Sequence, residues 1–320
     1  MKSFDEVLKD VKNAAIAGHV KPDGDCVGSC LGLYEYLRVN YPKIRTHVFL
    51  DPFPDGLAFL AEGKTITDEK DADEHYDVVF ALDCADPDRV GAGKKLMKQT
   101  DCLVCIDHHI SNPGYGDITV IEPDASSACE VVYSLMDDDR LTKETAVCLY
   151  TGIVHDTGVF QYSCVSPLTM QRAGQLMRFG FDSSDIIMKS VFEKTISHQK
   201  LIGLALERSM LTTDGEGIWS YVSSEDFKAL GSSRMETEGA VETLRNTKGI
   251  DYSVFLSEDD EGTWRCSFRS KGGNDVSRAA CAFGGGGHTR AAGCSFPAGK
   301  TPQEMIDAIT AQIVSQRENR

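Results

Sequence analysis

Short hydrophobic runs recur along the first third of the chain, and each carries an Asp or a His near its carboxyl end. The runs lie at residues 14–20, 45–51, 76–83 and 102–107. Stretches with apolar residues at helical spacing lie between them, the first at residues 26–40. Near-continuous hydrophobic strands that alternate with helices are typical of a parallel sheet with helices on both faces. We therefore expect an α/β fold with a parallel sheet in its N-terminal part.

The rest of the chain predicts further helices and then a second, smaller domain. An amphipathic helix is expected before residue 14, and helical spacing returns at residues 126–136, 143–154, 166–180 and 184–210. Strand and helix patterns are mixed in the last third. Because 320 residues exceed the size at which one core usually stops growing, we expect two domains. Their bounds are a parallel-sheet domain at 1–185, a helical linker at 186–211 and a mixed α/β domain at 212–320.

Composition and cysteine usage indicate a cytoplasmic protein. Hydrophobic residues make up 41% of the chain, and no stretch approaches the roughly 20 apolar residues that span a bilayer. The first residues lack the apolar core of a secretory signal. The eleven cysteines form no regular framework, which favours reduced thiols. Cys26 and Cys30 lie four residues apart on a predicted helix, and we interpret them as packing residues.

The charge of the chain is strongly acidic, with one basic region. A formal net charge of -16 argues against a protein that coats long nucleic acids, because such proteins need broad basic surfaces. Between residues 265 and 290, however, five Lys or Arg residues stand against one acid, Asp275. This region predicts a local site for a small anionic ligand.

Potential metal ligands gather at the carboxyl ends of the predicted strands, where open α/β sheets bind their ligands. His19, Asp23 and Asp25 lie between the first strand and its helix. A structural alternative explains the same loop, with Asp25 as the cap of that helix. Further potential ligands follow two other strands and a helix: Asp83, then Asp107, His108 and His109, then Asp156. Carboxylates and imidazoles in this number suit a pair of Mn²⁺ or Mg²⁺ ions acting on a phosphate ester.

Five motifs support this interpretation when they are taken together and in order. They are HxxxDxD at His19 to Asp25, a single Asp83, DHH at Asp107 to His109, HDTG at His155 to Gly158 and GGGGH at Gly284 to His288. With these motifs the chain resembles the DHH/DHHA1 family of phosphoesterases over essentially its whole length. Within that family it is most similar to the nanoRNase/pAp-phosphatase branch.

The resemblance implies a role for each matching residue. Two divalent cations would be bound, with Mn²⁺ expected and Mg²⁺ or Co²⁺ as alternatives. Their ligands would be His19 and Asp23 for the first ion, Asp25, His108 and Asp156 for the second, and Asp83 for both. Asp107 would orient a histidine, and His109 would face the scissile phosphate. The residues that would bind substrate are Asn112, Arg269, Arg278, Gly285, Gly286, Gly287 and His288.

The resemblance also implies the substrates. We expect a phosphodiesterase that converts very short oligoribonucleotides and linear dinucleotides such as pGpG and pApA to mononucleotides. It would also convert 3′-phosphoadenosine 5′-phosphate (pAp) to AMP. Hydrolysis of cyclic di-AMP, exonuclease activity on longer single strands, and an inactive nucleotide sensor remain alternatives, while inorganic pyrophosphatase activity fits the basic region less well. A homodimer is expected, and long duplexes and membranes are not expected partners.

Overall fold

The computed structural model describes residues 3–67 and 74–318, and the chain divides into two compact units. The first unit is Met1–Glu193 and the second is Lys194–Arg320. Each unit contains its own sheet and its own hydrophobic core. Among the described helices, none is both long enough and apolar enough to cross a membrane.

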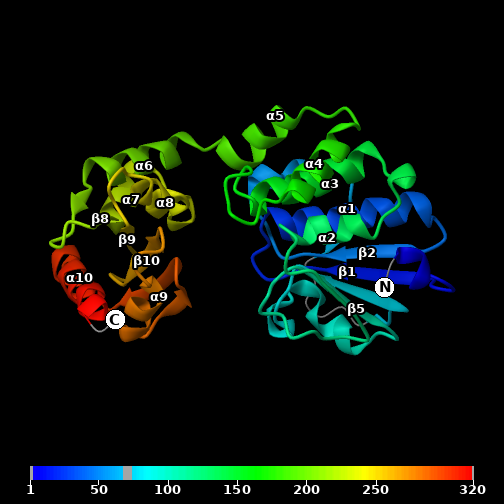
Figure 1. Ribbon diagram of the computed structural model, residues 1–320, viewed down its shortest axis with the longest axis horizontal. Helices are drawn as coiled ribbons and strands as arrows, with labels where there is room; N and C mark the ends of the chain where they lie inside the picture. Colours follow the sequence, from blue (N-terminus) through cyan, green and yellow to red (C-terminus); the bar gives the residue numbers. More distant parts are fainter. Residues whose placement is uncertain (1–2, 68–73, 319–320) are drawn as a thin grey trace. The chain divides into compact units, whose positions relative to one another are not determined.

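The first unit is built on a parallel sheet, as the hydrophobic runs predict (Figure 1). Its described strands are β1 (Asn13–Ala17), β2 (Arg45–Phe49), β3 (Ile66–Thr67), β4 (Val78–Leu82), β5 (Leu103–Asp107) and β6 (Ile118–Ile121). Their order is β3-β2-β1-β4-β5-β6, and every described pairing between them is parallel. The C-terminal ends of β1, β4 and β5 are therefore neighbours at one end of the sheet.

Helices cover this sheet. The α-helices are α1 (Gly24–Asn40), α2 (Ala128–Ser134), α3 (Lys143–Asp156), α4 (Pro167–Met177) and α5 (Ser183–Ile187). A π-helix, η6 (Met188–Phe192), continues α5, and the 3-10 helices are η1 (Phe4–Glu6), η2 (Asp55–Ala61), η3 (Pro87–Arg89), η4 (Ala92–Lys98) and η5 (Asp138–Arg140). In β1, Ala14 and Ile16 join the core under α1, whereas Ala15 and Ala17 join the core under η4. This alternation is what a strand buried on both faces requires.

Close packing of α1 against α3 brings ligands of two helices to one place. A side chain at Gly28 of α1 would lie 2.6 Å from the carbonyl oxygen of Cys148 in α3. Only glycine permits this approach. The N-terminal end of α1 and the C-terminal end of α3 consequently lie near the carboxyl ends of the strands.

Two predictions about helices are wrong. The expected N-terminal amphipathic helix is only the 3-10 turn η1, because Phe4 packs on the rings of Tyr36 and Phe80 and Asp10 has a φ of 65° that no helix allows. The helical pattern at 184–210 is interrupted at Glu193, where the backbone turns to an extended conformation before α6 (Ile196–Glu207) begins.

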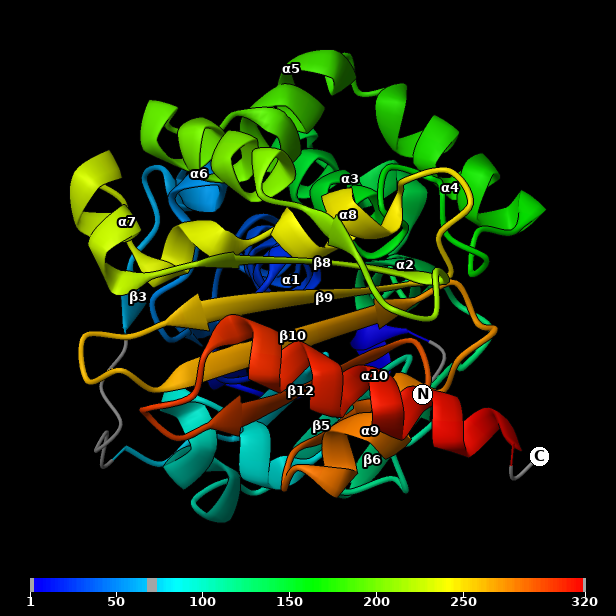
Figure 2. The same cartoon turned by 90° about the vertical axis from the view of Figure 1, so that its left-hand side faces the viewer.

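The second unit is a mixed sheet with helices on both faces (Figure 2). Its strands are β7 (Met210–Leu211), β8 (Gly217–Val222), β9 (Tyr252–Glu258), β10 (Trp264–Ser270), β11 (Gly286–His288) and β12 (Ala291–Phe296), in the order β11-β12-β10-β9-β8-β7. The β8–β9 pair is parallel and the other described pairs are antiparallel. The helices are α6, α7 (Ser224–Leu230), η7 (Arg234–Thr237), α8 (Ala240–Arg245), α9 (Val276–Ala282) and α10 (Pro302–Glu318).

Candidate metal centre

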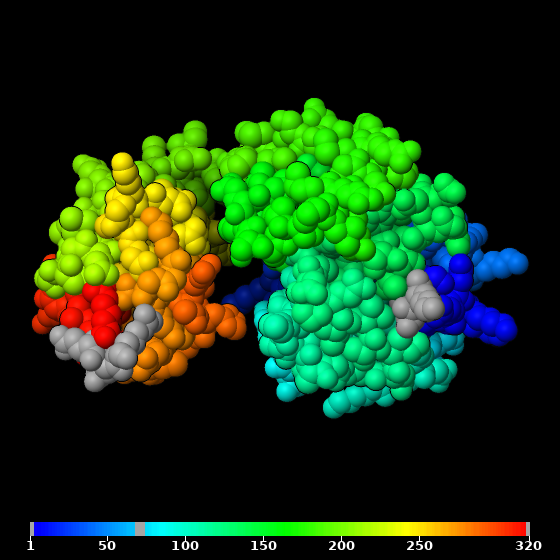
Figure 3. Space-filling view, viewed as in Figure 1, coloured from blue at the N-terminus to red at the C-terminus, as the bar shows by residue number. Residues whose placement is uncertain are grey.

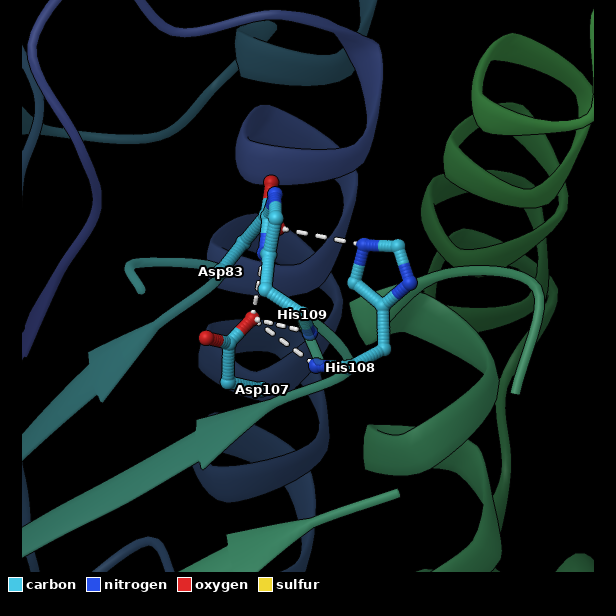
Figure 4. A group of neighbouring side chains, drawn as sticks. All are labelled: Asp83, Asp107, His108 and His109. Atoms are coloured by element: carbon cyan, nitrogen blue, oxygen red, sulfur yellow. Dashed lines mark hydrogen bonds and ion pairs between the residues drawn. The ribbon is translucent and has the colours of Figure 1, made fainter. Parts of the chain in front are cut away.

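The predicted metal ligands come together at the C-terminal ends of the strands of the first sheet. His19 follows β1, Asp83 follows β4 and His108 follows β5, while Asp23 and Asp25 begin α1 and Asp156 ends α3. Figure 4 shows Asp83 beside the Asp107-His108-His109 segment at the ends of neighbouring strands. Residues that are up to 137 positions apart in sequence thus form one group of side chains.

Asp83 lies between His19 on one side and His108 and His109 on the other, and its Oδ1 is 3.6 Å from Nδ1 of His109. Its Oδ2 is 3.4 Å from Nε2 of His19, and its Oδ1 is 3.7 Å from Nε2 of His108. The side chain is only 3% exposed. Its backbone has a φ of 52°, a left-handed conformation that non-glycine residues seldom adopt and that is common where a functional side chain must be aimed. Asp83 therefore has the placement of a carboxylate shared by two sites.

Each imidazole has its own set of carboxylates. Nε2 of His19 lies 3.7 Å from Oδ1 of Asp23. Nε2 of His108 lies 3.3 Å from Oδ2 of Asp156 and 3.9 Å from Oδ2 of Asp25. These separations suit atoms that bind a common cation, because ligands about 2.0 to 2.2 Å from one ion lie roughly 3 to 4 Å from each other.

Backbone amides hold the two carboxylates of α1 in place. The side chain of Asp23 caps α1 by accepting from the amides of Asp25 and Cys26, both at 3.1 Å. Asp25 instead accepts from the amides of Ala128, at 2.6 Å, and Cys129, at 2.9 Å, in the first turn of α2. The sequence allowed Asp25 to be the cap of α1, but Asp23 has that role in the structure. Asp25 is instead held at the N-terminus of α2, where the helix carries a partial positive charge.

The electrostatics of this group favour bound cations. Burial, together with the charges of Asp83 and Asp23, raises the pKa of Asp25 well above its ordinary value. Burial and then the charge of Asp25 raise the pKa of Asp156 to about 8. The buried Oδ1 of Asp83 has no hydrogen-bond donor among the described residues. Crowded carboxylates of this kind are stabilised when divalent ions share them, so the residues present fit a two-metal centre.

Asp107 and His109 form a hydrogen-bonded pair beside these ligands. Oδ1 of Asp107 lies 2.7 Å from Nδ1 of His109 and accepts from the amide of His108 at 2.8 Å. That hydrogen bond is the main reason why the pKa of His109 rises to about 9, although burial opposes the rise. The side-chain amide of Asn112 donates to Oδ2 of Asp107 at 2.6 Å, and the residue Asn112 is only 8% exposed. Asn112 therefore positions Asp107 in this structure, and His109 is the more exposed member of the pair.

The basic region of the second unit is organised around a hairpin edge. Three of the predicted substrate residues, Gly286, Gly287 and His288, form the exposed edge strand β11 rather than an irregular loop. Gly285, just before β11, lies against β12: a side chain there would be 2.1 Å from the carbonyl oxygen of Gly293. The segment of α9 and β11, coloured orange, lies on the surface of this unit (Figure 3).

The predicted arginines are placed differently from each other. Arg278 is exposed on α9. Nε of Arg269 donates to Oε1 of Glu242 at 2.7 Å, and its Nη1 donates to the carbonyl of Phe268. Sequence reasoning missed Glu242, because its distance of 27 residues from Arg269 carries no local signal. Sequence reasoning also did not anticipate that the buried Cys26 lies in one cluster with His19 and Asp83.

Comparisons with known proteins agree with this geometry. The DHH family, N-terminal domain, matches residues 13–153, and the DHHA1 domain matches residues 228–315. The bifunctional oligoribonuclease and PAP phosphatase NrnA of Bacillus subtilis is 33% identical over 290 residues, which cover 87% of each chain. Its counterpart in Thermus thermophilus is 30% identical, over 92% of this chain and 88% of its own.

A solved structure has the same architecture. An exopolyphosphatase-related protein from Bacteroides fragilis superimposes with a TM-score of 0.89 at 26% identity, over 98% of this chain and 95% of its own. The two matched domains lie in the first and in the second unit, respectively. The chain belongs to the DHH family of phosphoesterases and carries the DHHA1 domain of that family.

Proposed function

We propose that the protein hydrolyses very short oligoribonucleotides and linear dinucleotides such as pGpG and pApA to mononucleotides, and pAp to AMP. The observation that carries this proposal is the Asp83 carboxylate, which faces His19 through one oxygen and His108 through the other. A centre built around a shared carboxylate suits hydrolysis of a phosphate ester. The similarity to the NrnA proteins of two bacteria supports the choice of substrates.

The residues of the first unit would divide the work between binding cations and handling the phosphate. His19 and Asp23 would hold one ion, Asp25, His108 and Asp156 the other, and Asp83 both. We propose Mn²⁺, which when bound would supply Lewis-acid stabilisation of the phosphoryl oxygens and acidify a bound water.

His109 would act on the phosphate itself. Its Nδ1 is held by Asp107, which leaves Nε2 to donate a hydrogen bond or a proton to a phosphoryl or leaving oxygen. The hydrogen bond to Asp107 raises the pKa of His109, which favours the protonated imidazole that this role requires. Asp107 would stabilise that charge, as a buried carboxylate partner does for a catalytic histidine.

The second unit would recognise the rest of the nucleotide. Arg269 uses Nε and Nη1 in the described contacts, so its Nη2 and the second proton of Nη1 are available to a phosphate. The outer edge of β11 presents backbone groups that no other strand pairs within the described sheet. His288 and the glycines Gly285, Gly286 and Gly287 would use this edge, with Arg278 nearby in the chain on α9.

A substrate series tests the proposal. The wild-type protein with Mn²⁺ is assayed on pGpG, pApA, pAp, cyclic di-AMP and an RNA of 24 nucleotides, and kcat/KM is compared. We expect the linear dinucleotides to exceed the long RNA and cyclic di-AMP by at least about tenfold, which corresponds to about 1.4 kcal/mol of transition-state binding. A preference for the long RNA or for cyclic di-AMP would replace the proposed substrates. No hydrolysis of any of them would favour a nucleotide sensor.

A further inference from the structure

We propose that Cys26 supplies a thiolate ligand to the first metal position, the one formed by His19, Asp23 and Asp83. This position would then bind Zn²⁺, Co²⁺ or Fe²⁺ more tightly than Mn²⁺ or Mg²⁺, and the Mn²⁺ of the proposed function would occupy it where those ions are absent. The second position, formed by Asp25, His108 and Asp156, would keep a preference for the harder ions. The protein would thus bind two different metals in one centre.

The placement of Cys26 carries the proposal. Potential ligand atoms of His19, Cys26 and Asp83 all lie within 4.8 Å of one another. All three residues are buried, with exposed fractions of 7% for His19, 0% for Cys26 and 3% for Asp83. Cys26 is held there because its backbone amide donates to Oδ1 of Asp23 in the first turn of α1. A buried imidazole, thiol and carboxylate at this spacing is a donor set for a transition metal.

Asp83, which belongs to this cluster and also faces His108, points to bound cations by its burial. Asp83 is 97% buried and its Oδ1 has no hydrogen-bond donor among the described residues. A carboxylate oxygen buried without a donor is costly unless a cation lies against it. Oδ1 faces His108 and His109, so it calls for an ion at the second position. Oδ2 of the same carboxylate faces His19 at 3.4 Å, so an ion at the first position would be bound by His19 and Asp83, with Cys26 within reach.

The two metal positions differ in chemistry. The cluster of Asp25, His108 and Asp156 offers oxygen and imidazole donors only. The cluster of His19, Cys26 and Asp83 adds a sulfur donor. Thiolates bind Zn²⁺ and other soft or borderline ions far better than Mn²⁺ or Mg²⁺, which prefer oxygen. On binding, the thiol proton of Cys26 leaves to solvent and the sulfur lone pair forms the bond to the metal, so charge and atoms balance.

Packing is the competing explanation, and the chain provides a matched control for it. A side chain at Gly18 would lie 2.2 Å from Sγ of Cys26 and 3.2 Å from Sγ of Cys30. Both sulfurs therefore fill the space that Gly18 leaves, and both residues are fully buried on α1. Cys30, one turn further along, belongs to none of the ligand clusters among the described residues. A packing role predicts equal effects of the two cysteines, and a ligand role predicts an effect of Cys26 alone.

The inference rests on the metal centre of the proposed function, but its test needs no catalysis. The experiment uses the full-length protein with the exposed Cys164 and Cys281 replaced by Ser, which removes adventitious thiols. Metal-depleted protein is titrated with Co²⁺, and the near-ultraviolet band of sulfur-to-cobalt charge transfer is recorded. Cys26→Ala, Cys26→Ser and Cys30→Ala are compared in the same background, with circular dichroism as the check of folding.

We expect the band in the parent and in Cys30→Ala, and its loss in Cys26→Ala and Cys26→Ser. The affinity of Zn²⁺ relative to Mn²⁺, measured by competition, should fall at least about tenfold in the Cys26 variants and stay unchanged in Cys30→Ala. Absence of the band in the parent would overturn the inference, whatever the variants do. A band that persists in the Cys26 variants would also overturn the inference. A band that is lost in Cys30→Ala as well as in the Cys26 variants would do the same. If the band follows Cys26 but pGpG is not hydrolysed, the proposed function fails and the ligand assignment stands.

Discussion

Replacing Asp83 by Asn should remove most of the stabilisation that divalent ions give to the first unit. The change keeps the size of the side chain but removes the negative charge that faces both His19, at 3.4 Å, and His108, at 3.7 Å. An ion at 100 times its Kd stabilises the folded state by about 2.7 kcal/mol. For a unit of about 190 residues, with a shift of roughly 2 to 4 °C per kcal/mol, this gives about 5 to 10 °C for each bound ion.

The size of the loss follows from the loss of affinity. Even residues that only support a ligand contribute about 10- to 100-fold to metal affinity, so a shared ligand should contribute at least as much. A 100-fold loss at both positions leaves about 0.4 kcal/mol for each ion at the same Mn²⁺ concentration, or about 1 to 2 °C for each ion. Asp23→Asn is the matched control, because Asn caps helices as well as Asp does and we propose Asp23 as a ligand of the first ion alone. It should retain about half of the wild-type shift.

Differential scanning calorimetry with EDTA and with increasing Mn²⁺ measures these shifts. Both tryptophans, Trp219 and Trp264, lie in the second unit, so tryptophan fluorescence supplies an internal reference that Mn²⁺ should leave unmoved. The reasoning is refuted if Asp83→Asn keeps the full shift. It is equally refuted if Asp23→Asn and Asp83→Asn lose the same amount, because Asp83 would then serve a single ion.

Other predictions concern the second unit. Arg269→Ala should raise KM for pGpG and leave hydrolysis of bis-p-nitrophenyl phosphate little changed. Arg265→Ala, on the same face of β10, is the control and should change neither quantity. Equal KM values for the two variants would contradict this prediction. Gly285→Ala should raise KM for pGpG without loss of the fold, since the added carbon meets the carbonyl of Gly293 at 2.1 Å and displaces β11; an unchanged KM would show that this edge is not used. Burial opposes ionisation of Asp226, but hydrogen bonds from Arg208 and Ser223 lower its pKa to about 2. The contribution of ionised Asp226 to stability is therefore full above about pH 4 and is lost as the pH falls toward 2. Asp226→Asn should lower the free energy of unfolding by about 2 kcal/mol at pH 7, and the difference from the wild type should disappear in acid. A difference that does not depend on pH would show that ionisation of Asp226 is not its cause.

The sequence predicted the first sheet and the site at its edge because both depend on local patterns. A buried strand needs a continuous hydrophobic run, and its last polar residue must emerge at the edge of the sheet. His19, Asp83 and His108 were therefore predictable as neighbours once the strands were identified. The wrong N-terminal helix has a comparable explanation. Its apolar residues do face the core, but the contacts of Phe4 with Tyr36 and Phe80 hold it in a short turn that spacing alone does not reveal.

Contacts between distant residues set the details that the sequence left open. Asp25 is fixed by amides of α2 more than a hundred positions away, and Arg269 is held by Glu242. Asn112 is one of the predicted substrate residues, yet its side-chain amide donates to Asp107. Each of these contacts depends on how elements pack, which hydrophobic and polar periodicity does not specify.

Reconstitution of activity tests most directly whether this chain is a metal-dependent hydrolase of short nucleotides. Protein depleted of metal with EDTA is given pGpG, and release of GMP is followed as divalent ions are added back. We expect no release at first, and recovery that is complete when about two ions are bound per chain. Full activity in EDTA, or none at any metal loading, would contradict the account.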